Sequence, residues 1–253
     1  MFGKYRKDGN MLGKRYAQRI KEQLQLVEET QWKEVEKAAR LIAHSIKEGG
    51  LVHIFGCGHS HMLAEEIFYR AGGLVPVNPI FETSLMLHEG AVKSSMLEKT
   101  EGYASMILER YQPQPNEVMI IVSHSGVNAV PIEMAMEAVK KGLKVIAITS
   151  SAYSQVPSRH SSGQKLYELA HIMIDTHVPY GDALIAIPQL KVNIAPSSTV
   201  VGAFILNMLI AEVIEELLHL GIIPPVFVSG NVEGGFEYNQ SYIQQYRSRI
   251  RHL

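Results

Sequence analysis

The sequence has little of several features that would quickly assign a class of protein. Cys57 is the single cysteine among 253 residues, which excludes an internal disulfide. The two signs of charge nearly balance, because 24 Lys plus Arg stand against 25 Asp plus Glu. A formal net charge of -1 gives no overall field that would attract nucleic acid or an anionic membrane. Any anion must therefore be bound by local groups.

Long hydrophobic runs are also missing. The most apolar window, residues 199–213, is interrupted by Asn207 and Glu212, and it is shorter than the ~20 residues that a helix needs to cross a bilayer. The N-terminus, MFGKYRKDGNMLGKRY, lacks the apolar core of a secretory signal. We therefore expect a cytoplasmic protein with no membrane partner, in which residues 199–213 form a core or interface helix.

Two nucleotide-binding fingerprints are absent as well. The dinucleotide motif GxGxxG would need a glycine where His61 stands, and an acidic residue is missing after the second expected strand. The phosphate-loop motif GxxxxGK[ST] does not occur anywhere in the chain. The sequence therefore predicts no nucleotide cofactor, and we expect no other cofactor.

What the sequence does contain is a glycine turn between an apolar run and a helix, in residues 51–70, LVHIFGCGHSHMLAEEIFYR. Gly56 and Gly58 allow the backbone to turn sharply, and the free N–H groups of such a turn lie at the positive end of the helix dipole. The same arrangement recurs in residues 117–136, EVMIIVSHSGVNAVPIEMAM. Two anion-binding turns in one sheet predict a single phosphorylated ligand.

The two turns carry hydroxyl groups that can donate to a phosphate oxygen, from Ser60 in the first and from Ser123 and Ser125 in the second. A serine in a turn often bonds only to its own backbone. Three serines in two strand-to-helix turns favour phosphate binding over that alternative. Ser198, at the start of the apolar helix, is another possible anion contact, although ordinary helix capping explains it equally well.

The two turns together resemble a known family, the sugar isomerase (SIS) domain of phosphosugar isomerases and phosphosugar-binding proteins. GCGHSH is similar to the first loop of phosphoheptose isomerases, and SHSGVN is similar to the second SIS loop. The resemblance covers about residues 35–220, and it implies a phosphorylated sugar as ligand and a homodimer. The expected substrate-binding residues are Gly58, His59, Ser60, His61, Ser123, His124, Ser125, Gly126, Asn128 and Ser198.

The rest of the chain predicts one α/β domain. Helical spacing over residues 14–29 and 30–47 indicates two helices before the sheet, within a segment 14–48. Alternation of strands and helices over residues 51–220 predicts a doubly wound, five-stranded parallel sheet of flavodoxin-like type. A tail follows at 221–253, with a helix expected over residues 242–253, and residues 1–13 are expected to form a loosely held arm. The serine-rich segment 150–164 follows the fourth strand, so we expect it to face the site.

Catalytic candidates lie in the irregular segment 78–101 that follows the second strand. An aldose–ketose isomerase needs a base beside the carbonyl carbon and a second group that moves protons between oxygens. His88 and Glu89 are the first candidates, and Glu98 and Glu101 are the next. Glu65, on the helix that follows the first turn, could also face the sugar. The alternative is that the segment is only a solvated lid. A sugar-phosphate etherase or lyase, or a sensor without chemistry, remains open.

A metal is not expected in the first turn. Cys57, His59 and His61 alternate as C-x-H-x-H, but alternating side chains in a turn point in different directions. Phosphoheptose isomerases carry a His and, one helical turn later, a Glu on the helix after this loop. Counting from Ser60, this sequence has Glu66 and Arg70 at those places.

Overall fold

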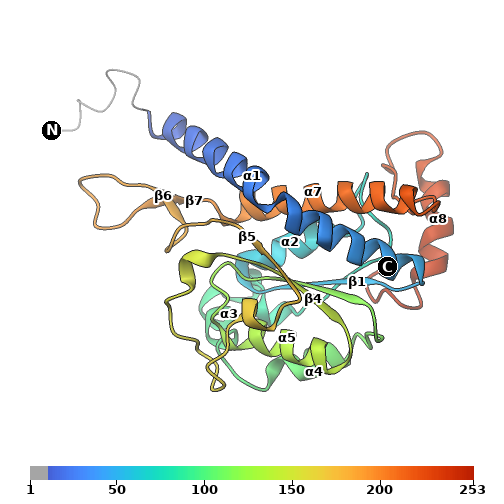
Figure 1. Ribbon diagram of the computed structural model, residues 1–253, viewed down its shortest axis with the longest axis horizontal. Helices are drawn as coiled ribbons and strands as arrows, with labels where there is room; N and C mark the ends of the chain where they lie inside the picture. The colour runs from blue at the N-terminus through green and yellow to red at the C-terminus, as the bar shows by residue number, and fades with distance from the viewer. Residues whose placement is uncertain (1–10) are drawn as a thin grey trace.

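The protein is built on a five-stranded parallel sheet. A computed structural model describes residues 11–253, and its main sheet has the strand order β2-β1-β3-β4-β5 (Figure 1). The strands are β1 (Val52–Gly56), β2 (Val77–Pro79), β3 (Val118–Val122), β4 (Lys144–Thr149) and β5 (Ile172–Asp175). The predicted doubly wound sheet is confirmed. Its strand order reverses direction between β1 and β3, which is where ligands bind in open α/β sheets.

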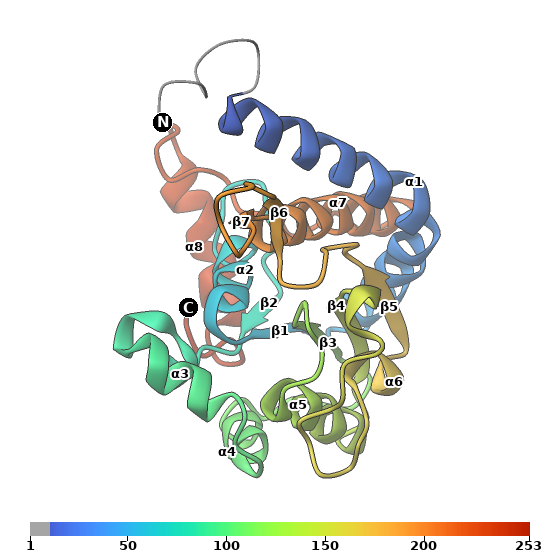
Figure 2. The same ribbon diagram turned by 90° about the vertical axis from the view of Figure 1, so that its left-hand side faces the viewer.

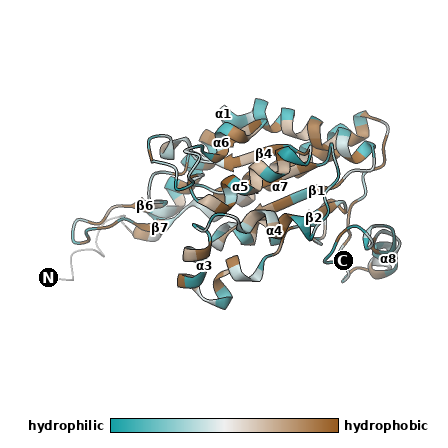
Figure 3. Ribbon diagram, turned by 90° about the horizontal axis from the view of Figure 1, so that it is seen from below, coloured by the Kyte–Doolittle hydropathy of each residue, from teal (hydrophilic) through white to brown (hydrophobic). Residues whose placement is uncertain are grey.

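Helices cover both faces of the sheet (Figures 1 and 2). One face packs on α1 (Leu12–Lys47), α2 (His61–Glu66) and α7 (Ser198–His219), and the other packs on α4 (Tyr103–Glu109), α5 (Ala129–Lys140) and α6 (Leu166–Leu169). Alternate residues of each strand enter the two cores, so that Ile120 faces α1 and α7 while Ile121 faces α4 and α5. Strands buried on both faces explain the continuous apolar runs, which Figure 3 shows as hydrophobic ribbon.

The N-terminal segment forms one helix where two were expected. α1 runs without a break through residues 28–31, and the Thr30 hydroxyl donates to the Leu26 carbonyl at 2.7 Å inside a helical turn. Of the polar residues that suggested a break, Glu28 and Glu29 are exposed, whereas Thr30 and Gln31 contact the end of β5. α1 packs lengthwise against α7, which confirms the apolar segment 199–213 as part of a core helix. Of the predicted arm, residues 1–10 lie outside the described part of the chain.

Smaller elements complete the fold. A two-stranded antiparallel hairpin, β6 (Ala183–Ile185) with β7 (Ile194–Pro196), was not expected, and it lies against the amino half of α1. The Arg15 side chain donates to the Ala186 carbonyl, and the Tyr16 hydroxyl donates to the Pro196 carbonyl. The remaining pieces are α3 (Ala91–Leu97), α8 (Gly235–Tyr246) and the short 3-10 turns η2 (Gly58–Ser60), η3 (Thr83–Leu85), η4 (Leu87–Glu89) and η5 (Ser151–Tyr153). The C-terminal helix thus begins and ends earlier than predicted.

The C-terminal segment is fastened to the amino edge of the sheet by Glu117. Its carboxylate accepts hydrogen bonds from the Leu51 amide at 2.8 Å, the Gln114 amide at 2.7 Å, His53 at 2.9 Å and Arg249 at 2.6 Å. Burial raises the pKa of this carboxyl group, but its hydrogen bonds and cationic neighbours outweigh burial and lower it to about 2.

Within residues 11–253, no helix combines the length and the hydropathy that a bilayer span requires.

Candidate functional site

The two serine loops begin side by side at the carboxyl edge of the sheet. β1 and β3 are neighbours, and Gly56 at the end of β1 pairs with Val122 at the end of β3. The chain then turns into η2 and α2 on one face, and into α5 on the other face. Both loops therefore start at the same level, at the position where the strand order reverses.

Two glycines let the loops adopt their sharp turns. A Cβ atom at Gly56 would lie 2.4 Å from the Ser60 carbonyl oxygen, so the close return of the first loop requires glycine. In the second loop, Gly126 has a φ of +62°, and a Cβ atom there would lie 2.7 Å from the Thr149 hydroxyl. These contacts explain the glycines that carried the sequence motif.

The structure separates the predicted serines into two kinds. The hydroxyls of Ser60 and Ser125 make no hydrogen bond to any residue in the described part of the chain. The Ser123 hydroxyl instead accepts from the Gly126 amide at 3.2 Å, and the Ser198 hydroxyl donates to Asp182 at 2.6 Å. Ser60 and Ser125 can therefore bind a ligand at once, whereas Ser123 and Ser198 already have structural partners.

Asp182 occupies the N-terminus of α7. One carboxylate oxygen accepts from the Ser197 amide at 2.9 Å and from the Ser198 amide at 2.8 Å. Asp182 adopts a φ of +64°, and its side chain reaches these amides from the loop just before β6. A carboxylate here is favoured by the helix dipole. The anion contact that the sequence suggested at Ser198 is thus made by the protein's own side chain.

His124, in the second loop, has a buried nitrogen without a partner. Its Nδ1 lies 3.5 Å from the Thr176 hydroxyl, while Nε2 is buried and makes no hydrogen bond. Burial lowers the pKa of His124 to about 4, although the nearby Asp182 carboxylate acts in the opposite direction. The ring is therefore neutral at pH 7, and Nε2 is a buried polar atom without a partner among the described residues.

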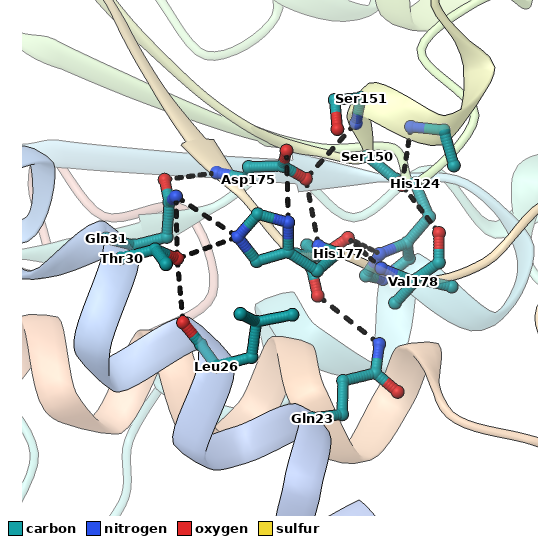
Figure 4. A network of polar contacts seen from close by, with 12 residues as sticks. Gln23, Leu26, Thr30, Gln31, His124, Ser150, Ser151, Asp175, His177 and Val178 are labelled. Carbon is teal, nitrogen blue, oxygen red and sulfur yellow. Dashed lines mark hydrogen bonds and ion pairs between the residues drawn. The ribbon is translucent and has the colours of Figure 1, made fainter.

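The end of β5 is connected to α1 by a polar network (Figure 4). The His177 ring lies 2.8 Å from the Thr30 hydroxyl and 3.3 Å from the Gln31 amide nitrogen, and the Asp175 carboxylate accepts from the His177 amide at 2.8 Å. The buried Gln23 also donates to the Thr176 carbonyl at 3.4 Å. α1 is thus connected to the same edge of the sheet as the two loops.

Several of the predicted residues lie together on the α2 side of the site. His61 is buried, with its Nε2 2.9 Å from a Glu65 oxygen and its ring 4.9 Å from the ring of Phe81. Burial lowers the pKa of His61, Glu65 raises it, and His88 is near enough to lower it further. The structure therefore brings His61, Glu65 and His88 into one neighbourhood.

Glu89 is less suited to proton abstraction than its position suggested. It is exposed, and its carboxylate accepts from Lys93 at 2.7 Å. Hydrogen bonds from Lys93 and Thr83 lower the pKa of Glu89, which weakens it as a base.

Glu98 has the properties that Glu89 lacks. It is partly buried at the end of α3, and burial raises its pKa. Its carboxylate hydrogen bonds to Asn128, whose own side-chain oxygen accepts from Arg159 at 2.6 Å. Because the Asn128 oxygen faces Arg159, its NH₂ group faces Glu98. The Asn128 side chain therefore bonds to two protein groups, Glu98 and Arg159.

From the sequence alone, Glu98 was only a secondary candidate and Arg159 was not a candidate. Glu98 comes close to the second loop because its carbonyl accepts from the Val130 amide at 3.0 Å, which ties α3 to the start of α5. Arg159 is held because its amide donates to the Val127 carbonyl at 2.8 Å. The one sequence feature that pointed to Arg159 was its place in the serine-rich segment after β4, because that segment was predicted to face the site.

The first loop offers a poor set of metal ligands. Cys57 is buried, and burial raises the pKa of its thiol well above the usual value, so the thiolate that zinc binds is disfavoured. His59 is exposed while His61 is buried.

Glu66 and Arg70, at the places of the phosphoheptose isomerase His and Glu, bond to each other at 2.5 Å. The other Glu66 oxygen accepts from Asn207 of α7 at 3.0 Å. The pair is therefore already engaged within the protein.

Comparison with known proteins agrees with this geometry. Residues 15–150 match the SIS domain, so the chain belongs to the SIS domain family. The resemblance drawn from the two loops is thereby confirmed. Within curated proteins the chain is similar to the UPF0309 protein of Geobacillus kaustophilus, with 49% identity over 236 residues that cover 93% of this chain and 94% of that protein. The UPF0309 protein of Caldanaerobacter subterraneus is 48% identical over 242 residues, which cover 94% of this chain and 98% of that protein.

Solved structures with the same fold include two phosphoheptose isomerases. The enzyme from Neisseria gonorrhoeae superposes with a TM-score of 0.51 at 17% identity, covering 81% of this chain and 98% of that one. The enzyme from Francisella tularensis gives a TM-score of 0.51 at 13% identity, covering 79% of this chain and 95% of that one. At these identities the likeness establishes the fold.

Proposed function

We propose that the protein binds a phosphorylated sugar at the carboxyl edge of the sheet and interconverts its aldose and ketose forms. The observation that carries the proposal is the pair of free hydroxyls, Ser60 and Ser125, on two adjacent turns at the point where the strand order reverses. Backbone N–H groups of both turns and the neutral His124 ring would complete the contacts to the ligand. Membership of the SIS domain family supports the same ligand class.

Glu98 is our choice for the group that takes the proton from the carbon beside the carbonyl. A base works best when its pKa lies near the working pH, and burial shifts Glu98 in that direction while Lys93 shifts Glu89 away from it. His88 and Glu65, on the α2 side, would move a proton between the two sugar oxygens of the enediol. A cytoplasmic homodimer that pairs in part through α7 belongs to the same proposal.

The test combines ligand binding with turnover. Heptose, hexosamine and muramic acid 6-phosphates are screened by thermal shift, and each compound that stabilises the protein is then assayed for conversion by NMR in D₂O. Ser60→Ala and Ser125→Ala should abolish the stabilisation. Glu98→Gln should keep it but lose turnover and deuterium incorporation, while Glu89→Gln should lose much less. Failure of every sugar phosphate to stabilise the wild type would contradict the proposal.

A second candidate function is a phosphosugar sensor without chemistry. It is favoured by the Glu66–Arg70 ion pair, which occupies the places of a His and a Glu in phosphoheptose isomerases. A sensor would bind one of the sugar phosphates, lose that binding in Ser125→Ala and show no turnover of any. A sugar-phosphate etherase or lyase would instead release the ether substituent of muramic acid 6-phosphate.

A further inference from the structure

Three side chains of metal-binding type converge outside the sugar site. Glu101 lies in the turn between α3 and α4, Glu133 lies on α5, and His160 lies in the serine-rich segment after β4. One ligand atom from each lies within 4.8 Å of the other two. His160 Nε2 is 3.5 Å from a Glu133 oxygen and 4.0 Å from a Glu101 oxygen. Donor atoms around a tetrahedral zinc ion lie about 3.3 Å apart, so a small adjustment would bring these three to bonding positions.

Each of the three groups is held in place by a neighbour. The Glu101 carboxylate accepts from the Ser161 amide at 2.6 Å and from its hydroxyl at 2.7 Å. The Glu133 carboxylate accepts from the Gly102 amide at 2.6 Å. Only 10% of the His160 side chain and 14% of the Glu133 side chain are exposed. Ligands that are oriented in advance lose little freedom when a cation binds.

The charge and the space at this cluster both favour a cation. Among the described ion pairs, His160 is the only basic partner of Glu101 or of Glu133, and it is positive only when protonated. A cavity of about 180 Å³ opens beside Glu133 and His160. A water molecule occupies about 30 Å³, so the cavity can hold an ion with its remaining water ligands. The nearly buried His160 Nε2 points at the two carboxylates without forming a hydrogen bond with either.

We propose that Glu101, Glu133 and His160 bind a divalent transition-metal ion. One imidazole and two carboxylates form a donor set of nitrogen and oxygen, which suits Zn²⁺ or Mn²⁺ better than Cu⁺, because Cu⁺ prefers sulfur. The open positions would be filled by water from the cavity. The proposed sugar chemistry uses none of these three ligands.

Binding requires the His160 proton to move. Without a metal, the Ser162 amide lies 3.1 Å from His160 Nδ1 and donates to it, so the proton of the neutral ring is on Nε2. A cation on Nε2 requires the tautomer that carries the proton on Nδ1, where this N–H can donate to the Ser162 hydroxyl at 2.8 Å in place of accepting from the Ser162 amide. Metal binding is therefore expected to change the tautomer of His160.

The ion would join two segments that reach the sugar site. Glu101 is three residues after Glu98, and His160 is next to Arg159, whose side chain holds Asn128. A metal bond between the two segments would fix both of these groups from outside. Its role would be to order the site, without contact to the sugar.

The test is metal titration of the tag-free full chain, first stripped with a chelator. Calorimetry with ZnCl₂ or MnCl₂ should show one saturable site, and the bound ion should raise Tm. Glu101→Gln and His160→Gln should each weaken the affinity more than about tenfold. Glu137→Gln is the matched control, because Glu137 lies one helical turn from Glu133 and lines the same cavity without belonging to the cluster. It should bind metal as the wild type does.

Two results would overturn the inference. One is the absence of saturable binding of either ion. The other is wild-type affinity in both Glu101→Gln and His160→Gln, with circular dichroism showing that the variants are folded. If metal has no effect on the wild type and His160→Gln has a lower Tm, then His160 only stabilises the fold, and the metal site is refuted. Because the readout is metal binding, failure of the sugar proposal leaves this test unaffected.

Discussion

At the scale of single residues, the burial of His124 predicts how the free energy of unfolding depends on pH. Its folded pKa of about 4 lies below the usual value of 6.5. As the pH falls below 6.5 the unfolded chain takes up a proton that the folded protein does not, so the free energy of unfolding falls until the pH reaches about 4. Between pH 6.5 and 5 the loss should be about 2 kcal/mol.

The measurement is urea unfolding of the wild type and of His124→Gln at pH 7 and pH 5, together with an NMR titration of the imidazole. The variant should lose less stability over this interval than the wild type. An imidazole midpoint near 6.5 in the folded protein would contradict the burial that the structure assigns to this ring.

At the scale of elements, the first loop and α1 allow a paired glycine experiment. Gly56→Ala should destabilise the protein by about 1–3 kcal/mol and weaken ligand binding, because the new methyl group would meet the Ser60 carbonyl. Gly13→Ala, on α1, should stabilise it by up to about 1 kcal/mol, because no residue of the described range 11–253 lies within 4 Å of the added Cβ and alanine favours helix. Denaturant unfolding of both variants checks the signs, and equal effects would contradict this account.

The sheet and both loops could be predicted because their signals are local. An apolar run, a glycine turn and a helix start occupy twenty consecutive residues, and each of them determines the structure of residues close to it in the chain. The continuity of α1 could not be read in the same way, because polar residues at 28–31 suit an exposed helix face as well as a break. In the structure these residues belong to one continuous helix, in which Thr30 bonds back to Leu26.

The parts of the site that escaped prediction depend on distant pairs. Glu98 differs from Glu89 because burial raises its pKa, and two of its neighbours, Asn128 and Arg159, come from 30 and 61 positions further along the chain. Asp182 reaches the N-terminus of α7 from the loop before β6, where its backbone adopts a left-handed conformation. No spacing in the sequence reports such contacts, since they arise only when the loops after β3, β4 and β5 meet at one edge.

At the scale of the whole molecule, Glu117 links the amino edge of the sheet to the C-terminal segment through Arg249. Its pKa is lowered from 4.5 to about 2, so it contributes stability above pH 4.5 that is lost as the pH falls toward 2. Each of its four partners donates a hydrogen bond, and an amide has only one oxygen with which to accept them.

Glu117→Gln should therefore cost about 2–4 kcal/mol at pH 7, because buried donors lose their acceptor. Its stability should also depend less on pH between about 4.5 and 2 than that of the wild type. Urea unfolding at pH 7 and pH 3 measures both effects. Unchanged acid sensitivity in the variant would show that other carboxyl groups dominate the acid transition.

Because α1 is one continuous helix, the directions in which the side chains at its two ends face are linked. Tyr16 and Arg15 hold the hairpin, Thr30 and Gln31 hold the end of β5, and the part beyond Val35 is buried against α7. One residue inserted after Gln31 would rotate the amino half by about 100° and shift it by about 1.5 Å, so that Tyr16 would face away from the hairpin. Seven inserted residues would complete almost two full turns and restore the facing, but they would shift the amino half by about 10.5 Å along the helix axis. The contacts at the two ends of this helix therefore constrain both its rotation and its length.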